Sequence, residues 1–457
     1  MREDTIAAIA TPPGTGGISI VRASGPDAIG IAEKTLKLKS GASLASLEPW
    51  TVRLASVVDG EGAQVDEALV LIMKAPRSYT GEDVVEVQCH GGSLVSQKVL
   101  AALLEAGARH AEPGEFTRRA FLNRRITLEE AEAVLDVVEA PTEYALSQAG
   151  RRLRGELGDR VRRWEESLYS ALAALQASID FPEDVDQGSS RAMDEMTRVH
   201  EEIAGLLDRA PLGLALTCGI EVCLVGPPNA GKSSLFNALL AAERAIVTEV
   251  PGTTRDILRE RTEWNGLPVL LLDTAGLRET SDVVETIGVE RAEKAASESE
   301  VIVYVVDSTV GLTGSDIDWV QKWLKQGRKV LLVASKADVS PRKVTEGELS
   351  EVAGGSYVMA SAKTGEGLEE IKNRVTGWFS RGHDPDLLSP GSARQVDCLR
   401  RASSSLGEAL SSHAEGWTED VVVICLEEAL KALAELTGKD VSEETLEQVF
   451  SRFCVGK

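Results

Sequence analysis

The chain has 457 residues, of which 49 are basic and 72 acidic, so its net charge is −23. This length allows about three domains with sizeable cores, and the charge argues against a general nucleic-acid-coating protein. Six cysteines without a Cys-x-x-Cys pair and five scattered histidines indicate neither a disulfide framework nor a zinc site. Because no signal peptide or apolar stretch of ~18 residues is evident, we expect a soluble cytoplasmic protein with no membrane partner.

The first part of the chain is rich in short β-like runs separated by Gly and Pro turns. These runs cover residues 18–22, 52–58, 68–73 and 84–89. Their β-branched composition and punctuation are typical of strands. We therefore predict a separate α+β domain over residues 1–120.

Helical patterns follow and return at the end of the chain. Thr127 and Glu130 have the spacing of a capping box. Beyond them, apolar residues recur at three- and four-residue steps and predict a long amphipathic helix that Gly155 and Gly158 weaken: Leu146, Ala149, Leu153, Leu157, Val161, Trp164, Leu168, Leu172, Leu175 and Ile179. A similar face near the end comprises Val423, Leu426, Ala429, Leu430 and Leu433. We expect one helical bundle domain in two parts, residues 121–217 and 381–457, divided by an inserted domain.

Ten arginines and no lysine fall between residues 118 and 163. They are Arg118, Arg119, Arg124, Arg125, Arg151, Arg152, Arg154, Arg160, Arg162 and Arg163. Two interpretations stay open, a local basic patch that binds RNA and a solvated, charged helix face.

The inserted segment, residues 218–380, begins with a phosphate-binding loop. Residues 226–234 read Gly-Pro-Pro-Asn-Ala-Gly-Lys-Ser-Ser between an apolar strand-like run and a helix-like run. The two glycines turn backbone N–H groups toward a polyphosphate, Lys232 reaches its outer oxygens, and the Ser233 hydroxyl can ligate Mg²⁺. This pattern predicts a Ras-like P-loop GTPase domain whose loop ligands are Asn229, Ala230, Gly231, Lys232, Ser233 and Ser234.

Two further segments complete the phosphate side. After an apolar run, Asp273 can hold the Mg²⁺ shell and the Gly276 N–H can reach the γ-phosphate. Gly252 allows a loop to close, and Thr254 can complete Mg²⁺ coordination. The predicted nucleotide ligands here are Thr248, Glu249, Val250, Pro251, Gly252, Thr253, Thr254, Asp273, Thr274, Ala275 and Gly276.

Two loops at the carboxyl ends of later strands predict a guanine pocket. Asp338 can accept two hydrogen bonds from the guanine edge, whereas adenine would leave this carboxylate unpaired, so GTP is favoured over ATP. Ser335 stands where GTPases usually carry Asn, and we expect a weaker tether to the phosphate loop. The residues assigned to the pocket are Ser335, Lys336, Asp338, Ser361, Ala362 and Lys363.

The group that positions the attacking water is not obvious. Leu277 occupies the place where many small GTPases carry Gln, so another side chain must orient the water. The acidic residues Glu279, Asp282 and Glu285 are candidates, and for each of them a solvated charged face is the alternative.

Several motifs spread over the whole chain together resemble the bacterial family of tRNA modification GTPases called MnmE or TrmE. The terminal Cys-x-Gly-Lys is the most specific of them. The motifs are Thr11-Pro-Pro-Gly-Thr-Gly-Gly17, Tyr79-Thr-Gly-Glu-Asp83, Cys89-His-Gly-Gly92, Pro113-Gly-Glu-Phe116, Arg119-Ala-Phe-Leu-Asn123, Asp180-Phe-Pro-Glu183, Gly252-Thr-Thr-Arg-Asp256 and Phe453-Cys-Val-Gly-Lys457.

The resemblance implies a specific activity. The family uses a tetrahydrofolate one-carbon unit to add a carboxymethylaminomethyl or aminomethyl group at carbon 5 of the wobble uridine, position 34, of certain tRNAs. It works as a homodimer, through its N-terminal domain, and with the flavoprotein MnmG (GidA), which carries the FAD. GTP hydrolysis is required.

The resemblance also assigns residues. Folate would contact Arg22, Glu82, Arg125 and Lys457, where the family usually has Lys at position 125 and often Arg at Thr15. Potassium would be bound by Asn229, Thr248, Val250 and Thr253, and Glu285 would position the attacking water. For Cys454 we predict a catalytic role in the modification chemistry, with a small buried hydrophobe as the alternative.

Two other functions stay open. A regulatory GTPase that binds ribosomal RNA or a membrane complex would need no folate. A stand-alone one-carbon transferase carrying a GTPase is the third interpretation. Ser19 occupies the last position of an incomplete Gly-x-Gly-x-x-Gly pattern that starts at Gly14, which favours redox chemistry on a partner.

Overall fold

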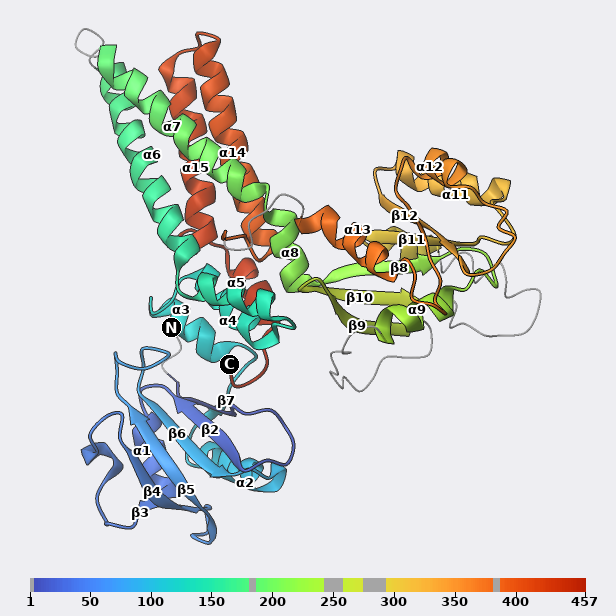
Figure 1. Cartoon of the computed structure of the whole chain (residues 1–457). Helices are drawn as coiled ribbons and strands as arrows, with labels where there is room; N and C mark the ends of the chain where they lie inside the picture. The colour runs from blue at the N-terminus through green and yellow to red at the C-terminus, as the bar shows by residue number, and fades with distance from the viewer. Residues whose placement is uncertain (1–3, 181–185, 242–257, 274–292, 381–386) are drawn as a thin grey trace. The chain divides into compact units, whose positions relative to one another are not determined.

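The computed structural model of the chain describes residues 4–180, 186–241, 258–273, 293–380 and 387–457 (Figure 1). These residues form two compact units. Unit 1 comprises 1–135, 153–169 and 426–457, and unit 2 comprises 136–152 and 170–425. The predicted domain boundaries at residues 120, 217 and 380 remain predictions.

A seven-stranded sheet forms the N-terminal part of unit 1. The strand order is β3-β4-β5-β6-β2-β1-β7, and only β1 and β7 pair in parallel. The strands are β1 (Ile6–Ile9), β2 (Ile18–Ser24), β3 (Leu36–Leu38), β4 (Val52–Val58), β5 (Gln64–Met73), β6 (Val84–His90) and β7 (Arg109–His110). Helices α1 (Ala28–Thr35) and α2 (Ser93–Glu105) pack on this sheet, and a 3₁₀ turn covers Leu44–Ser46. The predicted α+β fold is confirmed.

The two faces of this sheet differ in character. Val21 and Val87 belong to the core beneath α1 and α2. Because successive side chains point to opposite faces, Arg22 lies on the other face, where the register pairs it with Glu86. Leu54 and Leu69, paired across β4 and β5, are each 41% exposed. The sheet therefore has one covered face and one face that carries an ion pair and exposed apolar side chains.

The helical part contains the predicted helices in shorter pieces. They are α3 (Glu115–Leu122), α4 (Leu128–Glu139), α5 (Glu143–Leu153), α6 (Glu156–Asp180), α7 (Asp186–Leu207), α8 (Ala210–Cys218), α14 (Ala393–Ala414), α15 (Glu419–Thr437) and α16 (Glu443–Phe450). In unit 2, α7 packs on α14, and in unit 1, Phe450 and Phe453 pack with Leu128 of α4. The capping box at Thr127 is half formed, since Glu130 accepts from the Thr127 N–H at 2.8 Å but the buried Thr127 hydroxyl has no partner among the described residues.

The single long helix predicted across Leu146 to Ile179 is wrong. The chain breaks at Gly155, whose φ is 81°, and separates α5 from α6. Leu157, Val161, Trp164, Leu168 and Leu175 are buried as predicted, and so is Ala149. Leu146, Leu153 and Ile179 are exposed; on α5 the buried face is instead Ala145, Gln148, Ala149 and Arg152, because the break changes the helical phase. On α15 the core residue is Val422, and Val423 is only partly buried.

Unit 2 contains a six-stranded sheet with the order β13-β12-β11-β8-β10-β9, in which only β9 is antiparallel. The strands are β8 (Ile220–Val225), β9 (Leu258–Trp264), β10 (Leu267–Asp273), β11 (Val301–Asp307), β12 (Lys329–Ser335) and β13 (Tyr357–Met359). Helices α9 (Lys232–Ala241) and α13 (Leu368–Ser380) contribute to the core on one face, and α11 (Gly314–Lys325) and α12 (Glu346–Ala353) to the core on the other. This is the predicted P-loop GTPase architecture. No helix in the described ranges has the length and apolar character to cross a bilayer.

Candidate functional site

The phosphate loop has the backbone that its sequence predicts. Gly226 follows β8 with φ 142°, and a Cβ added there would lie 2.1 Å from the Val305 carbonyl oxygen. Gly231 has φ 90°, and Asn229 also lies in the left-handed region with φ 61°. Because α9 begins directly after Gly231, its free N–H groups face the loop and form an anion-binding end.

Lys232 spans the loop from the first turn of α9. Its ammonium donates to the carbonyl oxygens of Gly226 (2.9 Å) and Pro227 (2.8 Å), and the residue is 9% exposed. Burial lowers the pKa of Lys232, and the charge of Asp273 partly offsets this effect. The register sets Asp273, at the end of β10, opposite Leu224 of β8, so the carboxylate lies beside the loop. A phosphate group could replace the two carbonyl acceptors of Lys232.

The base-binding loop is tied to the phosphate loop by two side chains. The Ser335 hydroxyl donates to the Ala230 carbonyl oxygen. Lys336, with φ 56°, donates to the Asn229 carbonyl oxygen at 3.0 Å and to Asp307 at 2.6 Å. The serine thus keeps a tether at the position where Asn is usual.

Asp338 and Ser361 bring the two halves of the guanine pocket together. The Ser361 hydroxyl donates to Asp338 at 2.7 Å and the Ala337 N–H donates to the Ala360 carbonyl oxygen at 3.0 Å. The hydrogen bond from Ser361 lowers the pKa of Asp338, and the charge of Lys363 acts in the same direction. Asp338 is therefore held ionised, as an acceptor for N–H groups. Ala362 lies between Ser361 and Lys363 in the same loop.

Many predicted nucleotide and metal ligands lie outside the described residues. They are Thr248, Glu249, Val250, Pro251, Gly252, Thr253, Thr254, Thr274, Ala275, Gly276 and Glu285, together with Glu279 and Asp282. Of the described cation ligands, Ser233 and Asn229 are both exposed at the loop. Their hydroxyl and amide oxygens are the hard donors that Mg²⁺ and K⁺ require, so they fit these ions.

Arg22, the first predicted folate residue, lies on the open face of the N-terminal sheet. Its guanidinium donates to Glu86 at 2.8 Å. The guanidinium carbon lies 5.5 Å from the Phe116 ring centre and 5.9 Å from that of Tyr79. Sequence analysis missed Glu86 because only the strand register, across 64 residues, brings it to Arg22.

Glu82 belongs to a network of charged side chains. It accepts from the Ser24 hydroxyl at 2.7 Å and from the Arg119 guanidinium at 3.3 Å. Arg119 is 7% exposed and also pairs with Asp4 (2.7 Å) and Glu115 (3.0 Å). Arg119 is therefore a buried partner of the predicted folate carboxylate and belongs to no surface patch.

The C-terminal tail is fixed against the beginning of α3. Val455 forms a β-bridge with Pro113, and the Phe116 N–H donates to the Lys457 carbonyl oxygen at 3.2 Å. A Cβ added at Gly456 would lie 2.3 Å from the Ile9 carbonyl oxygen, so the tail runs close to β1. Cys454 is exposed, and the alternative of a buried hydrophobe is wrong.

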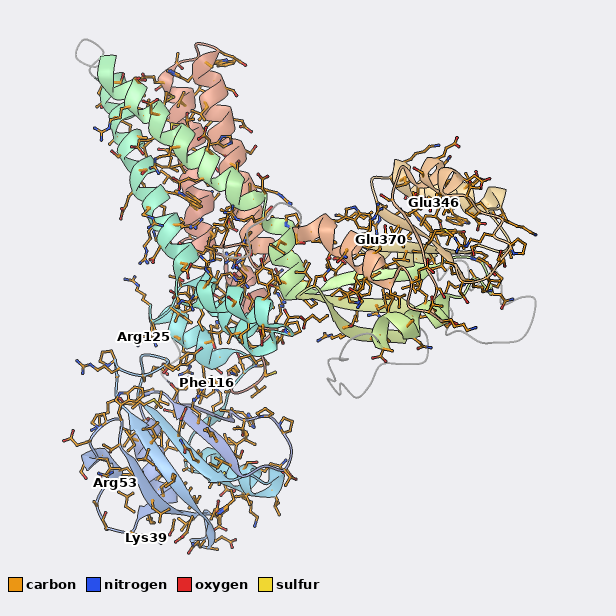
Figure 2. The ribbon with its side chains drawn as sticks, viewed as in Figure 1. Lys39, Arg53, Phe116, Arg125, Glu346 and Glu370 are labelled. Carbon is orange, nitrogen blue, oxygen red and sulfur yellow. The ribbon has the colours of Figure 1, made fainter. Side chains whose placement is uncertain are left out.

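Arg125 follows α3, at whose beginning Phe116 lies (Figure 2). The Arg125 Cγ lies 3.2 Å from the position of a Cβ added at Gly81, the residue before Glu82. Phe116 contacts both the Arg22 guanidinium and the terminal residue. The four predicted folate residues are therefore gathered around α3 and the segment that precedes β6.

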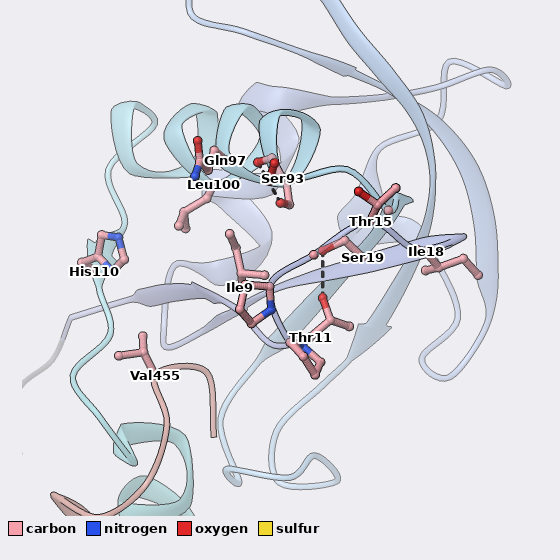
Figure 3. A pocket seen from close by; sticks show the side chains of 16 residues that line it. Ile9, Thr11, Thr15, Ile18, Ser19, Ser93, Gln97, Leu100, His110 and Val455 are labelled. Carbon is pink, nitrogen blue, oxygen red and sulfur yellow. Dashed lines mark hydrogen bonds between the residues drawn. The ribbon is translucent and has the colours of Figure 1, made fainter. Parts of the chain in front are cut away.

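A cavity of about 570 Å³ lies beside the tail (Figure 3). It is lined by the loop from Thr11 to Gly16, by α2, by His110 and by Val455. At its wall, the hydroxyls of Thr11 and Ser19 are 2.8 Å apart. Thr15, at which the family often has Arg, lines this cavity. None of the four predicted folate residues does, so Thr15 and these four do not share this cavity.

Arginines with low exposure in the segment between residues 118 and 163 form ion pairs within the fold. Arg152, 1% exposed, pairs with Asp136 at 2.9 Å, and Arg118 pairs with Glu443. Arg124, Arg125, Arg154, Arg162 and Arg163 are exposed. The segment thus combines internal ion pairs with a smaller set of surface cations.

Family models match nearly the whole chain. The model described as the GTP-binding protein TrmE N-terminus matches residues 5–125, and that of the MnmE helical domain matches residues 128–454. The chain belongs to the MnmE family. The tRNA modification GTPase MnmE of Symbiobacterium thermophilum is 44% identical over 469 residues, covering 100% of both chains, and that of Bacillus subtilis is 40% identical over 461 residues, covering 99% of this chain and 100% of the relative.

Among solved structures, part of this MnmE-family chain is similar to the G domain of an iron transporter and to the protein Era. The G domain of the T. maritima FeoB iron transporter is 27% identical and covers 35% of the chain and 98% of its own length, with a TM-score of 0.27. Aquifex aeolicus Era is 26% identical and covers 40% of the chain and 66% of its own, with a TM-score of 0.29. Family membership and the loop geometry identify a GTP-hydrolysing enzyme of tRNA modification.

Proposed function

We propose that this MnmE-family protein adds a carboxymethylaminomethyl or aminomethyl group to carbon 5 of the wobble uridine, position 34, of certain tRNAs, with a one-carbon unit from tetrahydrofolate. The observation that carries the proposal is the position of the Arg22 guanidinium, 5.5 Å from the Phe116 ring centre, where Phe116 also contacts the terminal Lys457. Folate combines a flat ring that has N–H donors with a carboxylate tail. An aromatic and cationic site with nearby carboxylates suits both parts.

Each proposed folate residue would act through its charge. Glu82 would accept from N–H groups of the ring, as an ionised carboxylate does. Arg22, Arg125 and Lys457 would pair with the carboxylates of the tail, and the planar fork of Arg125 can bind a carboxylate with two hydrogen bonds. Arg119 would hold Glu82 in place, since it lies 3.3 Å from that carboxylate.

GTP hydrolysis would follow from the geometry of the phosphate loop. Lys232 and the N–H groups of α9 would bind the phosphates, and Ser233 with Thr254 would ligate Mg²⁺. Asn229, Thr248, Val250 and Thr253 would bind K⁺, which supplies positive charge near the phosphates in the manner of an arginine finger. Glu285 would orient the attacking water.

The modification chemistry would divide between this chain and a flavoprotein. The sequence has no complete dinucleotide-binding fingerprint, so we propose that MnmG (GidA) supplies FAD. Cys454 would take part in the modification, because it is exposed on the tail that contacts the folate region. The function requires access to tRNA, and we place the protein in the cytoplasm.

We also propose a homodimer through the open face of the N-terminal sheet. Val52, Leu54 and Leu69 are 41–45% exposed there and form an apolar surface beside the Arg22–Glu86 pair. A second copy that covered this face would bury the apolar side chains and bring two folate regions near the interface. Separately, we propose domain boundaries at residues 120, 217 and 380.

Calorimetric titration with 5-formyltetrahydrofolate tests this function. We expect binding by the full chain, and at least about tenfold weaker binding by Arg22→Gln and by Lys457→Gln, because each loses a charge-assisted contact. Lys457→Gln is the variant less prone to misfolding, since Lys457 is only partly buried at the end of the chain, and Arg198→Gln on α7 is the control. Absence of folate binding by the unaltered chain would overturn the proposal and favour a regulatory GTPase.

A further inference from the structure

A second cavity in unit 1 lies at the carboxyl end of α3. Its volume is about 730 Å³, and three arginines and a lysine are among the residues that line it. These cations are Arg124, Arg125, Arg162 and Lys439, from the segment after α3, from α6 and from the segment after α15. Figure 2 labels Arg125, which follows the carboxyl end of α3.

Two carboxylates, Glu129 and Glu130, also line the cavity. Glu130 accepts from the Thr127 N–H at 2.8 Å, and Glu129 is fully buried. Arg162 pairs with Asp159, while Arg124 and Arg125 form no ion pair within the described residues and are exposed. Lys439 pairs with Glu165, so the lining cations without a carboxylate partner in the described ranges are the exposed Arg124 and Arg125.

Arg124 has a backbone that an arginine rarely adopts. It follows Asn123, the C-cap of α3, with φ 57°, in the left-handed region where glycine normally ends a helix. This backbone completes the end of α3, since the Arg124 N–H donates to the Phe121 carbonyl oxygen at 2.9 Å and the Arg125 N–H to that of Ala120 at 2.8 Å. The turn leaves the Arg124 side chain exposed.

We propose that this cavity binds phosphodiester groups of the tRNA backbone, an inference that rests on the proposed function in tRNA modification. The chain as a whole carries −23, so RNA must be attracted by a local cluster of cations. Arg124 and Arg162, the two arginines of the cavity that are not assigned to folate, have forked guanidinium donors that match phosphate oxygens. The cavity extends over three segments and can contact more than one phosphate.

The test measures tRNA binding by the full chain at several salt concentrations. The variant is Arg124→Gln combined with Arg162→Gln. Lys439 stays, because it pairs with the buried Glu165, and Arg125 stays, because it is assigned to folate. The control combines Arg198→Gln with Arg401→Gln, two exposed arginines on α7 and α14 that pair with carboxylates four residues away.

We expect the variant to bind tRNA about tenfold more weakly at low salt, with a slope of log affinity against log salt that falls by about one to two, since each lost phosphate contact removes about 0.7–0.9. GTP turnover and 5-formyltetrahydrofolate affinity should stay unchanged. An unchanged slope, loss of folate affinity in place of tRNA affinity, or no tRNA binding by the unaltered chain would overturn the inference. If the unaltered chain binds tRNA but no folate, the proposed function fails while this site stands.

Discussion

The hydroxyl of Ser335 donates a hydrogen bond to the carbonyl oxygen of Ala230 and joins the base-binding loop to the phosphate loop. Ser335 is 5% exposed, so this bond is shielded from water. A short side chain reaches the loop because β12 ends close to it: a Cβ added at Gly231 would lie 3.4 Å from the Ser335 hydroxyl. The tether consists of this hydroxyl hydrogen bond and that of Lys336, and its weakness relative to a tether from Asn remains a prediction.

Ser335→Ala should weaken GTP binding by about tenfold. The substitution removes one hydrogen bond and leaves the Ala230 carbonyl oxygen unpaired, a loss of about 1–2 kcal/mol. Fluorescent GTP analogues can measure the affinity, and Ser297→Ala, at a surface hydroxyl of the same unit, is the control. If the two variants bind GTP equally well, the tether contributes nothing to the site.

GTP hydrolysis should depend on potassium. Asn229 is exposed on the phosphate loop, and no arginine finger or Gln is evident in the sequence, so a monovalent ion would supply the missing charge. Turnover is compared in matched potassium and sodium chloride. We expect sodium to serve poorly and Asn229→Ala to abolish the difference; equal rates in both salts would exclude this cation site.

Glu285→Ala should lower GTP turnover by about 10²-fold or more while GTP affinity is unchanged. This is the usual scale for the loss of a group that positions a reactant. Single-turnover hydrolysis and equilibrium binding separate the two effects, with Asp282→Ala as the matched control. Normal hydrolysis by Glu285→Ala together with a slow Asp282→Ala would move the assignment to Asp282.

The ion network around α3 should make unit 1 acid-sensitive. The hydrogen bond from Arg109 lowers the pKa of Asp4 below its usual 3.8, and for Glu115 the bonds from Arg109 and Arg119 outweigh burial and lower the pKa below 4.5. Since both carboxyl groups bind protons more tightly in the unfolded chain, they stabilise the fold above pH about 4.5, and this stability is lost as the pH falls through the lowered values.

Urea unfolding at several pH values checks this prediction. Glu115→Gln should be less stable than the unaltered chain near pH ~7, because Arg109 and Arg119 lose a charged partner, and it should lose less stability between pH ~5 and ~3. The exposed Glu61→Gln is the control. An unaltered pH dependence in Glu115→Gln would show that the network does not govern acid stability.

Local patterns gave most of the fold and the nucleotide site. The run 52–58 is β4, and Gly226 to Gly231 forms the predicted loop before α9, because alternation, glycine positions and helix capping act over a few residues. The Arg22–Glu86 pair and the contact of the tail with β1 depend on residues far apart in the chain, so no local pattern could locate them. Leu146 and Leu153 follow the predicted stripe but are exposed, because the turn at Gly155 changes the helical phase.

The proposed function is tested most directly by a reconstituted modification reaction with tRNA, GTP, potassium, a tetrahydrofolate one-carbon donor and the flavoprotein partner, followed by mass analysis of the tRNA nucleosides. We expect a modified wobble uridine only when folate and the flavoprotein are both present. With Cys454→Ser, GTP turnover should stay normal while modification falls sharply. Full modification without folate or the flavoprotein would contradict the proposed function, and full modification by Cys454→Ser would show that this exposed thiol takes no part in the chemistry.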